Sequence, residues 1–316
     1  MSKTTKGIHH ITAIAGDPQE NIDFYAGVLG LRLVKKTVNF DDPGTYHLYF
    51  GNELGHPGTI MTFFPWAGVR QGRSGAGQVS VTSFVVPEQA LPFWEKRLMA
   101  FDVSFQKVTR FDETYLQFTD PHGLQLELVA RKAGENSQWL VADITPDVAI
   151  KGFGGAVLSS GSFDGTAEVL TDVLGLKQVS QDDQYLRFYA EGERGQVIDL
   201  KISPQAQGLM GAGTVHHIAW RAQDDEDQLE WRSHLSKNQL QPTDVKDRQY
   251  FNSVYFREHG GILFEIATDT PGFDTDESYE NLGQALKLPQ WLEQHRGKIE
   301  EILSPVDVQP MKGDRS

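Results

Sequence analysis

The sequence predicts an α+β protein built from four βαβββ modules that pair into two cupped β-sheet domains. One sign is an internal repeat: Val28-Leu29-Gly30-Leu31 returns as Val173-Leu174-Gly175-Leu176, 173 − 28 = 145 residues later. Another is a His-His-Ile motif at residues 9–11 that returns at residues 216–218. In addition, four successive segments each show the pattern of a strand, a helix and three strands. One module is too small to bury its own sheet, so we expect the modules to pair around a shared cleft.

The repeats and the strand–helix pattern give the position of each module along the chain. The helix of the first module ends at Gly30, where a helix C-cap favours glycine, and the alternation in residues 46–50 predicts a strand. In the second module, Val79–Val86 is the opening strand and the helix lies around Leu91–Leu98. The third opens at residues 152–155, and the fourth opens at the second histidine motif. The modules therefore cover about 7–66, 78–132, 151–203 and 213–268.

Two breaks in the pattern suggest the domain boundaries. A polar linker at about 132–150, which contains Pro146, separates the second module from the third. Beyond residue 270 the chain is rich in Pro, Gly and acidic residues, and then has the pattern of a helix around Leu288–Leu303. We therefore expect a first domain at 1–140, a second domain at 141–275 and a C-terminal helical tail at 276–316.

Composition excludes several classes of function. The chain has 316 residues and a net charge of −14, which disfavours a nucleic-acid partner because phosphate binding needs clustered Lys and Arg. It has no cysteine, so disulfides, thiolate metal sites and cysteine nucleophiles are excluded. No apolar run approaches the roughly 18 residues of a membrane span, and the N-terminus has no signal-peptide core. We expect a cytoplasmic protein with no membrane partner.

Candidate metal ligands appear when the closing strands of the four modules are compared. Counting four residues on from Gly58, Gly123, Gly195 and Gly261 gives Thr62, Glu127, Asp199 and Glu265. At the matching place on the opening strands, the first module has His10 and the fourth has His217, whereas the second and third have no histidine. Modules one and four thus carry two histidines and a carboxylate. Modules two and three have carboxylates at the equivalent positions but no imidazole ligands.

This set of donors points to one class of metal chemistry. Two imidazoles and one carboxylate, with the other positions open, form the facial triad of non-haem Fe(II) oxygenases. Glu265 lies in an apolar strand, where a glutamate is rarely buried unless it is paired or bound to a metal. Glu127 lies in an equally apolar strand, and there an arginine partner is an adequate explanation.

The motifs in combination resemble one family along essentially the whole chain. The pattern is similar to the vicinal oxygen chelate superfamily, which includes glyoxalase I, extradiol dioxygenases and bleomycin-resistance proteins. Within it, the sequence most resembles the bacterial hydroquinone and chlorohydroquinone ring-cleaving dioxygenases. The stretches that carry the resemblance are Ile8-His9-His10-Ile11-Thr12, Phe24-Tyr25, Leu33-Val34-Lys35-Lys36-Thr37, Tyr46-His47-Leu48-Tyr49-Phe50, Pro57-Gly58-Thr59, Val215-His216-His217-Ile218-Ala219, Phe264-Glu265 and Leu288-Pro289-Gln290-Trp291-Leu292-Glu293.

The resemblance implies a non-haem Fe(II) ring-cleaving dioxygenase of the extradiol type, which opens hydroquinone-like aromatic rings with O₂. It implies that His10, His217 and Glu265 hold the Fe(II), and that His9, Arg248 and Tyr255 contact substrate or oxygen. Alternation along an ideal strand turns His9 away from His10, so a role for His9 needs a bulge or a strand end. We leave the remaining candidate histidines out of the site: His47, His216 and His259.

Other functions stay open at this point. A metal-dependent glyoxalase or isomerase of the same fold usually has four protein ligands, and Thr62 stands where the fourth would be. A metal-free small-molecule binding protein of the resistance type would have inert histidines. A catechol dioxygenase would share the triad. The high aromatic content and the resemblance are both compatible with a homo-oligomer.

Overall fold

The computed structural model describes residues 3–308 and contains all four expected modules. In the first half of the chain the elements are β1 (Ile8–Ala15), α1 (Pro18–Ile22), η1 (Asp23–Val28), β2 (Arg32–Asn39), β3 (Asp42–Gly51), β4 (Ile60–Pro65), β5 (Gln78–Val86), α2 (Leu91–Ala100), β6 (Phe105–Arg110), β7 (Glu113–Thr119) and β8 (Gln125–Ala130). Residues 1–2 and 309–316, which include the end of the expected tail, lie outside the described residues.

The second half repeats the arrangement and adds the tail. Its elements are β9 (Gly152–Ser159), α3 (Phe163–Glu168), η2 (Val169–Val173), β10 (Lys177–Gln181), β11 (Tyr185–Tyr189), β12 (Val197–Lys201), β13 (Thr214–Ala222), α4 (Asp225–Lys237), β14 (Lys246–Asp247), β15 (Phe251–Arg257), β16 (Leu263–Pro271), η3 (Phe273–Thr275), η4 (Tyr279–Asn281), α5 (Gln290–Glu293) and α6 (Arg296–Ile302). The predicted α+β fold of four βαβββ modules is confirmed.

Local chemistry explains the repeated helices. The Asp17 carboxylate caps α1 by accepting hydrogen bonds from the backbone N–H groups of Gln19 and Glu20. In the first and third modules the helix continues into the π-helical turns η1 and η2. Both then end at a glycine with positive φ, +67° at Gly30 and +74° at Gly175. The repeated Val-Leu-Gly-Leu motif therefore marks a repeated helix end, as predicted.

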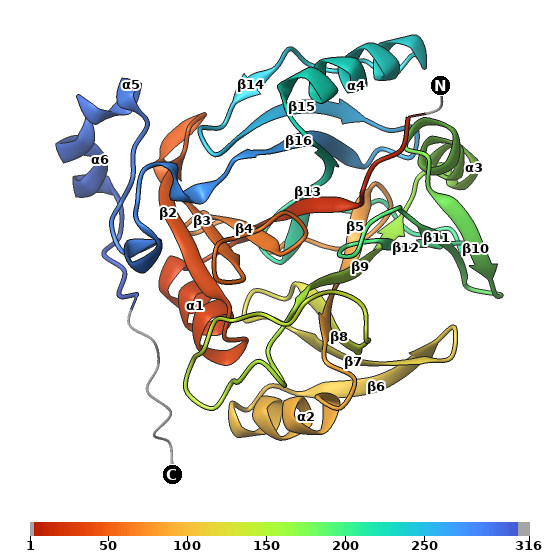
Figure 1. The fold of residues 1–316 in the computed structure, drawn as a ribbon, viewed down its shortest axis with the longest axis horizontal. Coiled ribbons are helices and arrows are strands. Elements are labelled where there is room, and N and C mark those ends of the chain that lie inside the picture. Colours follow the sequence, from red (N-terminus) through yellow and green to blue (C-terminus); the bar gives the residue numbers. More distant parts are fainter. Residues whose placement is uncertain (1–2, 309–316) are drawn as a thin grey trace.

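The strands form two curled eight-stranded sheets, seen in Figure 1. The first has the order β14-β15-β16-β13-β1-β4-β3-β2, and the second has the order β10-β11-β12-β9-β5-β8-β7-β6. Module one thus pairs with module four, and module two pairs with module three. Each sheet therefore combines strands from both sides of the expected boundary near residue 140, because the antiparallel pairs β1–β13 and β5–β9 join the two halves of the chain.

Two connections cross between the sheets and explain this pairing. Residues 66–77 lead from β4 to β5, residues 202–213 lead from β12 to β13, and isolated bridges join them at 71–212, 73–209 and 76–207. The backbones approach closely at glycines: a Cβ on Gly75 would lie 2.3 Å from the Ala206 carbonyl oxygen, and one on Gly211 would lie 2.4 Å from that of Arg70. Side chains at these positions would force the two connections apart.

The helices cover one face of each sheet and leave the concave face of the first sheet open to the site. Trp94 of α2 and Trp231 and Leu235 of α4 are almost fully buried in the same cluster as Ile11 of β1. Burying side chains of this size contributes about 1.5–3 kcal/mol each. Because side chains alternate along a strand, His10 points away from this apolar cluster toward the concave face of the sheet.

The tail packs beside β2 and β3 as two short helices, α5 and α6, rather than as the single expected helix (Figure 1). His295 leaves helical geometry between them (φ −106°, ψ 4°). The Tyr46 hydroxyl donates to the Ser304 carbonyl (3.0 Å), and the fully buried Lys35 ammonium pairs with Asp276 and Glu277 at the start of the tail. Within residues 3–308 there is no helix with the length and apolarity needed to cross a membrane.

Candidate metal centre

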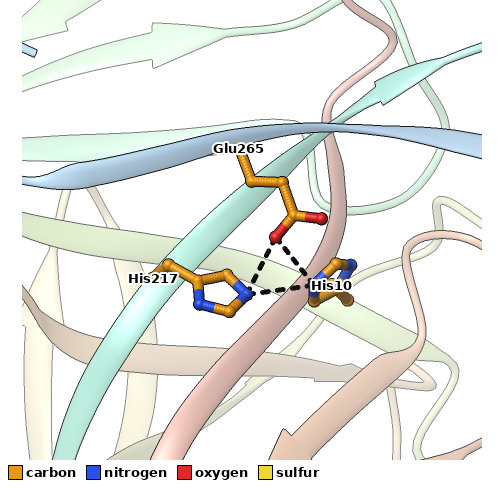
Figure 2. A group of neighbouring side chains, drawn as sticks. All are labelled: His10, His217 and Glu265. Atoms are coloured by element: carbon orange, nitrogen blue, oxygen red, sulfur yellow. Dashed lines mark hydrogen bonds and ion pairs between the residues drawn. The ribbon is translucent and has the colours of Figure 1, made fainter. Parts of the chain in front are cut away.

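Three buried side chains from three neighbouring strands converge at the middle of the first sheet (Figure 2). They are His10 of β1, His217 of β13 and Glu265 of β16, and their ligand atoms all lie within 4.8 Å of one another. The two Nε2 atoms are 3.2 Å apart, and Glu265 Oε2 lies 2.9 Å from His217 Nε2 and 3.4 Å from His10 Nε2. The structure therefore brings together the three residues that the sequence singled out as ligands.

The strand register places each of these residues. The parallel pair β13–β16 sets Ala219 beside Glu265, and the parallel pair β1–β4 sets Thr12 beside Thr62. In the second sheet the same register sets Ser83 beside Glu127 and Val157 beside Asp199. The four residues found by counting from the closing-strand glycines therefore hold equivalent positions. Thr62 stands where a symmetric site would have a second carboxylate.

Each His-His motif contains a bulge in the β1–β13 pair. The register shifts between Ile8 and His10, which leaves His9 as the extra residue, and it shifts again opposite His216. As a result, His9 Nδ1 lies 2.9 Å from His10 Nδ1, and His216 Nδ1 lies 2.8 Å from His217 Nδ1. The bulge that a role for His9 required is present, and the fourth module repeats it.

Hydrogen bonds and burial define the protonation of the centre. Burial lowers the pKa of His9 well below its ordinary value and that of His216 to about 3, so both rings are neutral. We assign an Nδ1–H on His10 and on His217 that donates to the preceding histidine, which leaves both Nε2 lone pairs directed at the centre. Burial would raise the pKa of Glu265, but positive charge on the His10 and His217 rings outweighs this and holds it well below its ordinary value. A divalent cation bound by the two Nε2 atoms would act on this carboxyl in the same direction.

The resulting arrangement fits a divalent cation. Two imidazole lone pairs and one carboxylate oxygen meet in a buried space, with one formal negative charge among them. Glu265 Oε2 has no hydrogen-bond partner among the described residues, whereas its other oxygen accepts a hydrogen bond from the Ser253 hydroxyl. A buried carboxylate oxygen without a donor is costly, and a bound metal ion would satisfy it. This set of nitrogen and oxygen donors is the one expected for a facial triad.

A cavity of about 360 Å³ opens onto the centre and has largely aromatic walls. His10, His217, Arg248 and Tyr255 line it, and so do the rings of Phe40, Tyr49, Phe64, Trp66 and Phe251. A flat aromatic molecule matches such walls in shape and polarity.

Arg248 and Tyr255 reach this cavity from the end of β14 and from β15. Arg248 Nε donates to the Tyr255 hydroxyl (3.2 Å), and Arg248 Nη2 lies 3.0 Å from the Asp41 carboxylate. Burial raises the pKa of Tyr255, so its phenol keeps its proton. Because the Tyr255 oxygen accepts from Arg248, its own O–H is free to donate into the cavity.

His9 lies behind His10 rather than in this cavity. Its ring contacts Phe251, with a distance of 5.3 Å between ring centroids, and it lines a separate cavity of about 180 Å³. Two histidines that were not predicted as site residues, His47 and His216, do line the larger cavity. The repeat of the His-His motif could have indicated His216; no sequence signal distinguished His47.

The second sheet has an arginine network at the equivalent place. Arg110 Nη2 lies 2.9 Å from Glu127 Oε2, and Arg110 Nε lies 2.6 Å from Asp199 Oδ2. Arg187 Nε contacts the other oxygen of Asp199 at 2.7 Å. Glu127 therefore has the arginine partner that was one reading of its apolar strand. Within residues 3–308, His10, His217 and Glu265 form the one cluster of three side chains placed to bind a metal.

Comparison with known proteins agrees with this architecture. The family described as the Glyoxalase/Bleomycin resistance protein/Dioxygenase superfamily matches residues 7–128 and 153–266, two modules in each match. MhqO of Bacillus subtilis (strain 168), assigned by its name to the ring-cleaving dioxygenases, is 60% identical over 311 residues, which are 98% of this chain and 100% of MhqO. The chlorohydroquinone/hydroquinone 1,2-dioxygenase of Sphingobium indicum is 35% identical over 318 residues, with 96% of both chains covered.

A solved structure extends the agreement to three dimensions. The crystal structure of a Bacillus subtilis subsp. subtilis str. 168 protein, also assigned by name to the dioxygenases, superposes with a TM-score of 0.97 at 60% identity. The match covers 98% of this chain and 100% of that one. On fold, sequence and site together, the chain belongs to the Glyoxalase/Bleomycin resistance protein/Dioxygenase superfamily.

Proposed function

We propose that this protein is an Fe(II)-dependent ring-cleaving dioxygenase of the extradiol type that opens hydroquinone-like rings with O₂. The observation that carries the proposal is the buried cluster of two imidazoles and one carboxylate at the base of an aromatic-walled cavity. The names of the relatives support the reaction class, and that of the Sphingobium enzyme supports the substrate class.

His10, His217 and Glu265 would hold the metal. When bound, Fe(II) in a facial triad supplies open coordination positions for substrate oxygen and O₂ and takes part in their electron exchange. His9 and His216 accept the Nδ1–H of the two ligand histidines, which fixes the ring orientation and leaves Nε2 free for the metal. In this proposal His9 positions His10 and does not contact the substrate.

Arg248 and Tyr255 act on the substrate from the wall of the cavity. The guanidinium is a fixed cation beside the space for the ring, so it favours the phenolate over the phenol and stabilises negative charge that develops on oxygen. Tyr255 offers its O–H as a directed donor because its oxygen is already engaged by Arg248. The aromatic walls orient the ring and keep water away from it.

The structure weighs against the alternatives. A glyoxalase with four protein ligands would need a ligand at Thr62, and the hydroxyl there is instead engaged with Thr12 Oγ1 (2.9 Å) and His47 Nε2 (2.8 Å). A binding protein with inert histidines would have no need to hold the buried Glu265 carboxylate against the ring nitrogens of two imidazoles.

The test is anaerobic reconstitution with Fe(II), followed by oxygen-electrode assays on hydroquinone, catechol and the methylglyoxal–glutathione adduct. We expect O₂ uptake with hydroquinone and no isomerisation of the adduct. O₂ uptake with catechol and not with hydroquinone would change the proposed substrate class from hydroquinones to catechols. Isomerisation of the methylglyoxal–glutathione adduct without O₂ uptake would overturn the proposed function.

A further inference from the structure

The two sides of the cavity are related by the pseudo-symmetry of modules one and four, and each side carries a tyrosine. On β15 Tyr255 stands opposite Glu265, and on β3 Tyr49 stands opposite Thr62. In the sheet order, β15 and β3 flank the central pair β13–β1 at equal distance. Both tyrosine rings line the cavity. The curled sheet therefore offers two phenol groups to one bound molecule, one from each module.

The partners of the two tyrosines differ in charge. Tyr255 accepts from the Arg248 guanidinium, whereas the Tyr49 hydroxyl lies 2.8 Å from His47 Nδ1. Burial lowers the pKa of His47 well below its ordinary value, and the nearby His10, His217 and Arg248 lower it further, so this ring is neutral. Tyr255 thus has a cationic partner, whereas the groups hydrogen-bonded to Tyr49 are uncharged.

The uncharged groups beside Tyr49 form a continuous hydrogen-bonded chain. It runs from Thr12 Oγ1 to Thr62 Oγ1 (2.9 Å), then to His47 Nε2 (2.8 Å), and from His47 Nδ1 to the Tyr49 hydroxyl. A neutral imidazole has one N–H and one lone pair, and a hydroxyl can donate or accept, so the chain is complete in both tautomers. With Nε2–H, Tyr49 donates to His47 and its oxygen can accept from a ligand. With Nδ1–H, the Tyr49 O–H is free to donate to one.

This reversible polarity suits a group that is both donor and acceptor, namely an un-ionised hydroxyl. Resting on the proposed function, we propose that Tyr49, held by His47, is the subsite for the second, un-ionised hydroxyl of a para-dihydroxy ring whose first oxygen lies at the metal as a phenolate. Tyr49 and His47 would then be specificity residues. They select a ring with hydroxyls at opposite ends over a ring with one hydroxyl, and over a catechol, whose two adjacent hydroxyls lie at the same end.

The test measures anaerobic binding of two ligands to the Fe(II)-loaded protein by calorimetry: hydroquinone, and 4-methylphenol, in which a methyl group replaces the second hydroxyl. Tyr49→Phe should weaken hydroquinone about tenfold, since a neutral site built to pair a hydroxyl loses that order when the partner is removed. It should leave 4-methylphenol binding and iron content nearly unchanged. His47→Phe should weaken hydroquinone in the same sense, and His47→Gln, whose amide can replace both hydrogen bonds, should retain most of the affinity.

Tyr46→Phe is the matched control, because Tyr46 lies on the same strand and its hydroxyl bonds to the tail at Ser304. The control should keep the wild-type preference for hydroquinone. Equal weakening of both ligands by Tyr49→Phe, or no weakening of either, would overturn the subsite. If Tyr49→Phe loses the preference for hydroquinone over 4-methylphenol but the unmodified protein consumes no O₂, the subsite is supported and the proposed function is overturned. The two failures are therefore distinguishable.

Discussion

Replacing Arg248 separates the chemistry of the cavity from the binding of metal. The guanidinium touches none of the three candidate ligands, and its contacts are the Tyr255 hydroxyl at 3.2 Å and the Asp41 carboxylate at 3.0 Å. The side chain of Asp41 is 69% exposed, so it stays hydrated when Arg248 is removed. An ion pair with one well-hydrated partner contributes about 0–1 kcal/mol to stability, and we expect Arg248→Ala to fold and to bind iron normally.

The effect on turnover should be much larger than the effect on folding. The Arg248 side chain is only 18% exposed and lines the space for the ring, so its charge acts where little water screens it. Removing one preorganised donor of this kind typically costs about 10²–10³ in rate, which corresponds to roughly 2.7–4 kcal/mol. Arg248→Lys should recover little, because an ammonium cannot donate to Tyr255 and the substrate with the geometry of a planar guanidinium.

The assay is steady-state O₂ uptake on hydroquinone, with iron content and thermal unfolding measured on the same samples. Arg257→Ala is the control: Arg257 lies on β15, is exposed, and donates to the Gly261 carbonyl (2.7 Å) outside the cavity. We expect kcat to fall by the stated order in Arg248→Ala and to be unchanged in the control. Wild-type turnover in Arg248→Ala would refute the role of this guanidinium.

Three further predictions follow from the same geometry. Alanine at His10, His217 or Glu265 should each abolish activity and most of the bound iron, as metal analysis would show, and full iron occupancy in His10→Ala would exclude module one from the centre. Glu127→Gln should keep iron and turnover but lower the free energy of unfolding by about 1–3 kcal/mol, because it leaves the buried Arg110 less well paired; loss of iron in this variant would contradict the asymmetry of the two sheets. Burial would raise the pKa of Glu113, but Arg131, Tyr115 and Arg187 hold it at about 2, against an ordinary value of 4.5. The contribution of Glu113 to stability is therefore complete above pH 4.5 and is lost as the pH falls toward 2. In Glu113→Gln the urea-unfolding midpoint should fall less steeply between these pH values than in the unmodified protein, and an equally steep fall would contradict this.

The modules and the equivalent positions on the four closing strands could be predicted from the sequence, because both depend on spacing over a few residues. Counting from the closing-strand glycines placed Thr62, Glu127, Asp199 and Glu265 in equivalent positions because a parallel strand pair repeats the same register in each module. The strand contacts that join module one to module four were not predictable in this way. It depends on how the connections at 66–77 and 202–213 cross, and on close backbone contacts at glycines far apart in the chain.

The walls of the cavity show a similar limit. His47 and His216 were set aside as structural or exposed histidines, although the repeated His-His motif could have indicated His216. His47 becomes notable only through its two hydrogen bonds, to Thr62 and Tyr49, which require the folded β3–β4 pair. The bulge places the ring of His9 against His10, a contact that an ideal strand would not have given. The strand positions of these histidines could be predicted from the sequence, but the hydrogen-bond partners of His9 and His47 could not.

The central claim is that the His10–His217–Glu265 centre opens an aromatic ring with O₂. Its most direct test is mass spectrometry of the product formed from hydroquinone by the Fe(II)-loaded protein under ¹⁸O₂, with Glu265→Ala as the inactive control. We predict a ring-opened product that carries both atoms of the labelled O₂. A product with an intact ring would contradict the claim. So would a ring-opened product with one labelled oxygen or none, once exchange of its oxygen atoms with water has been excluded.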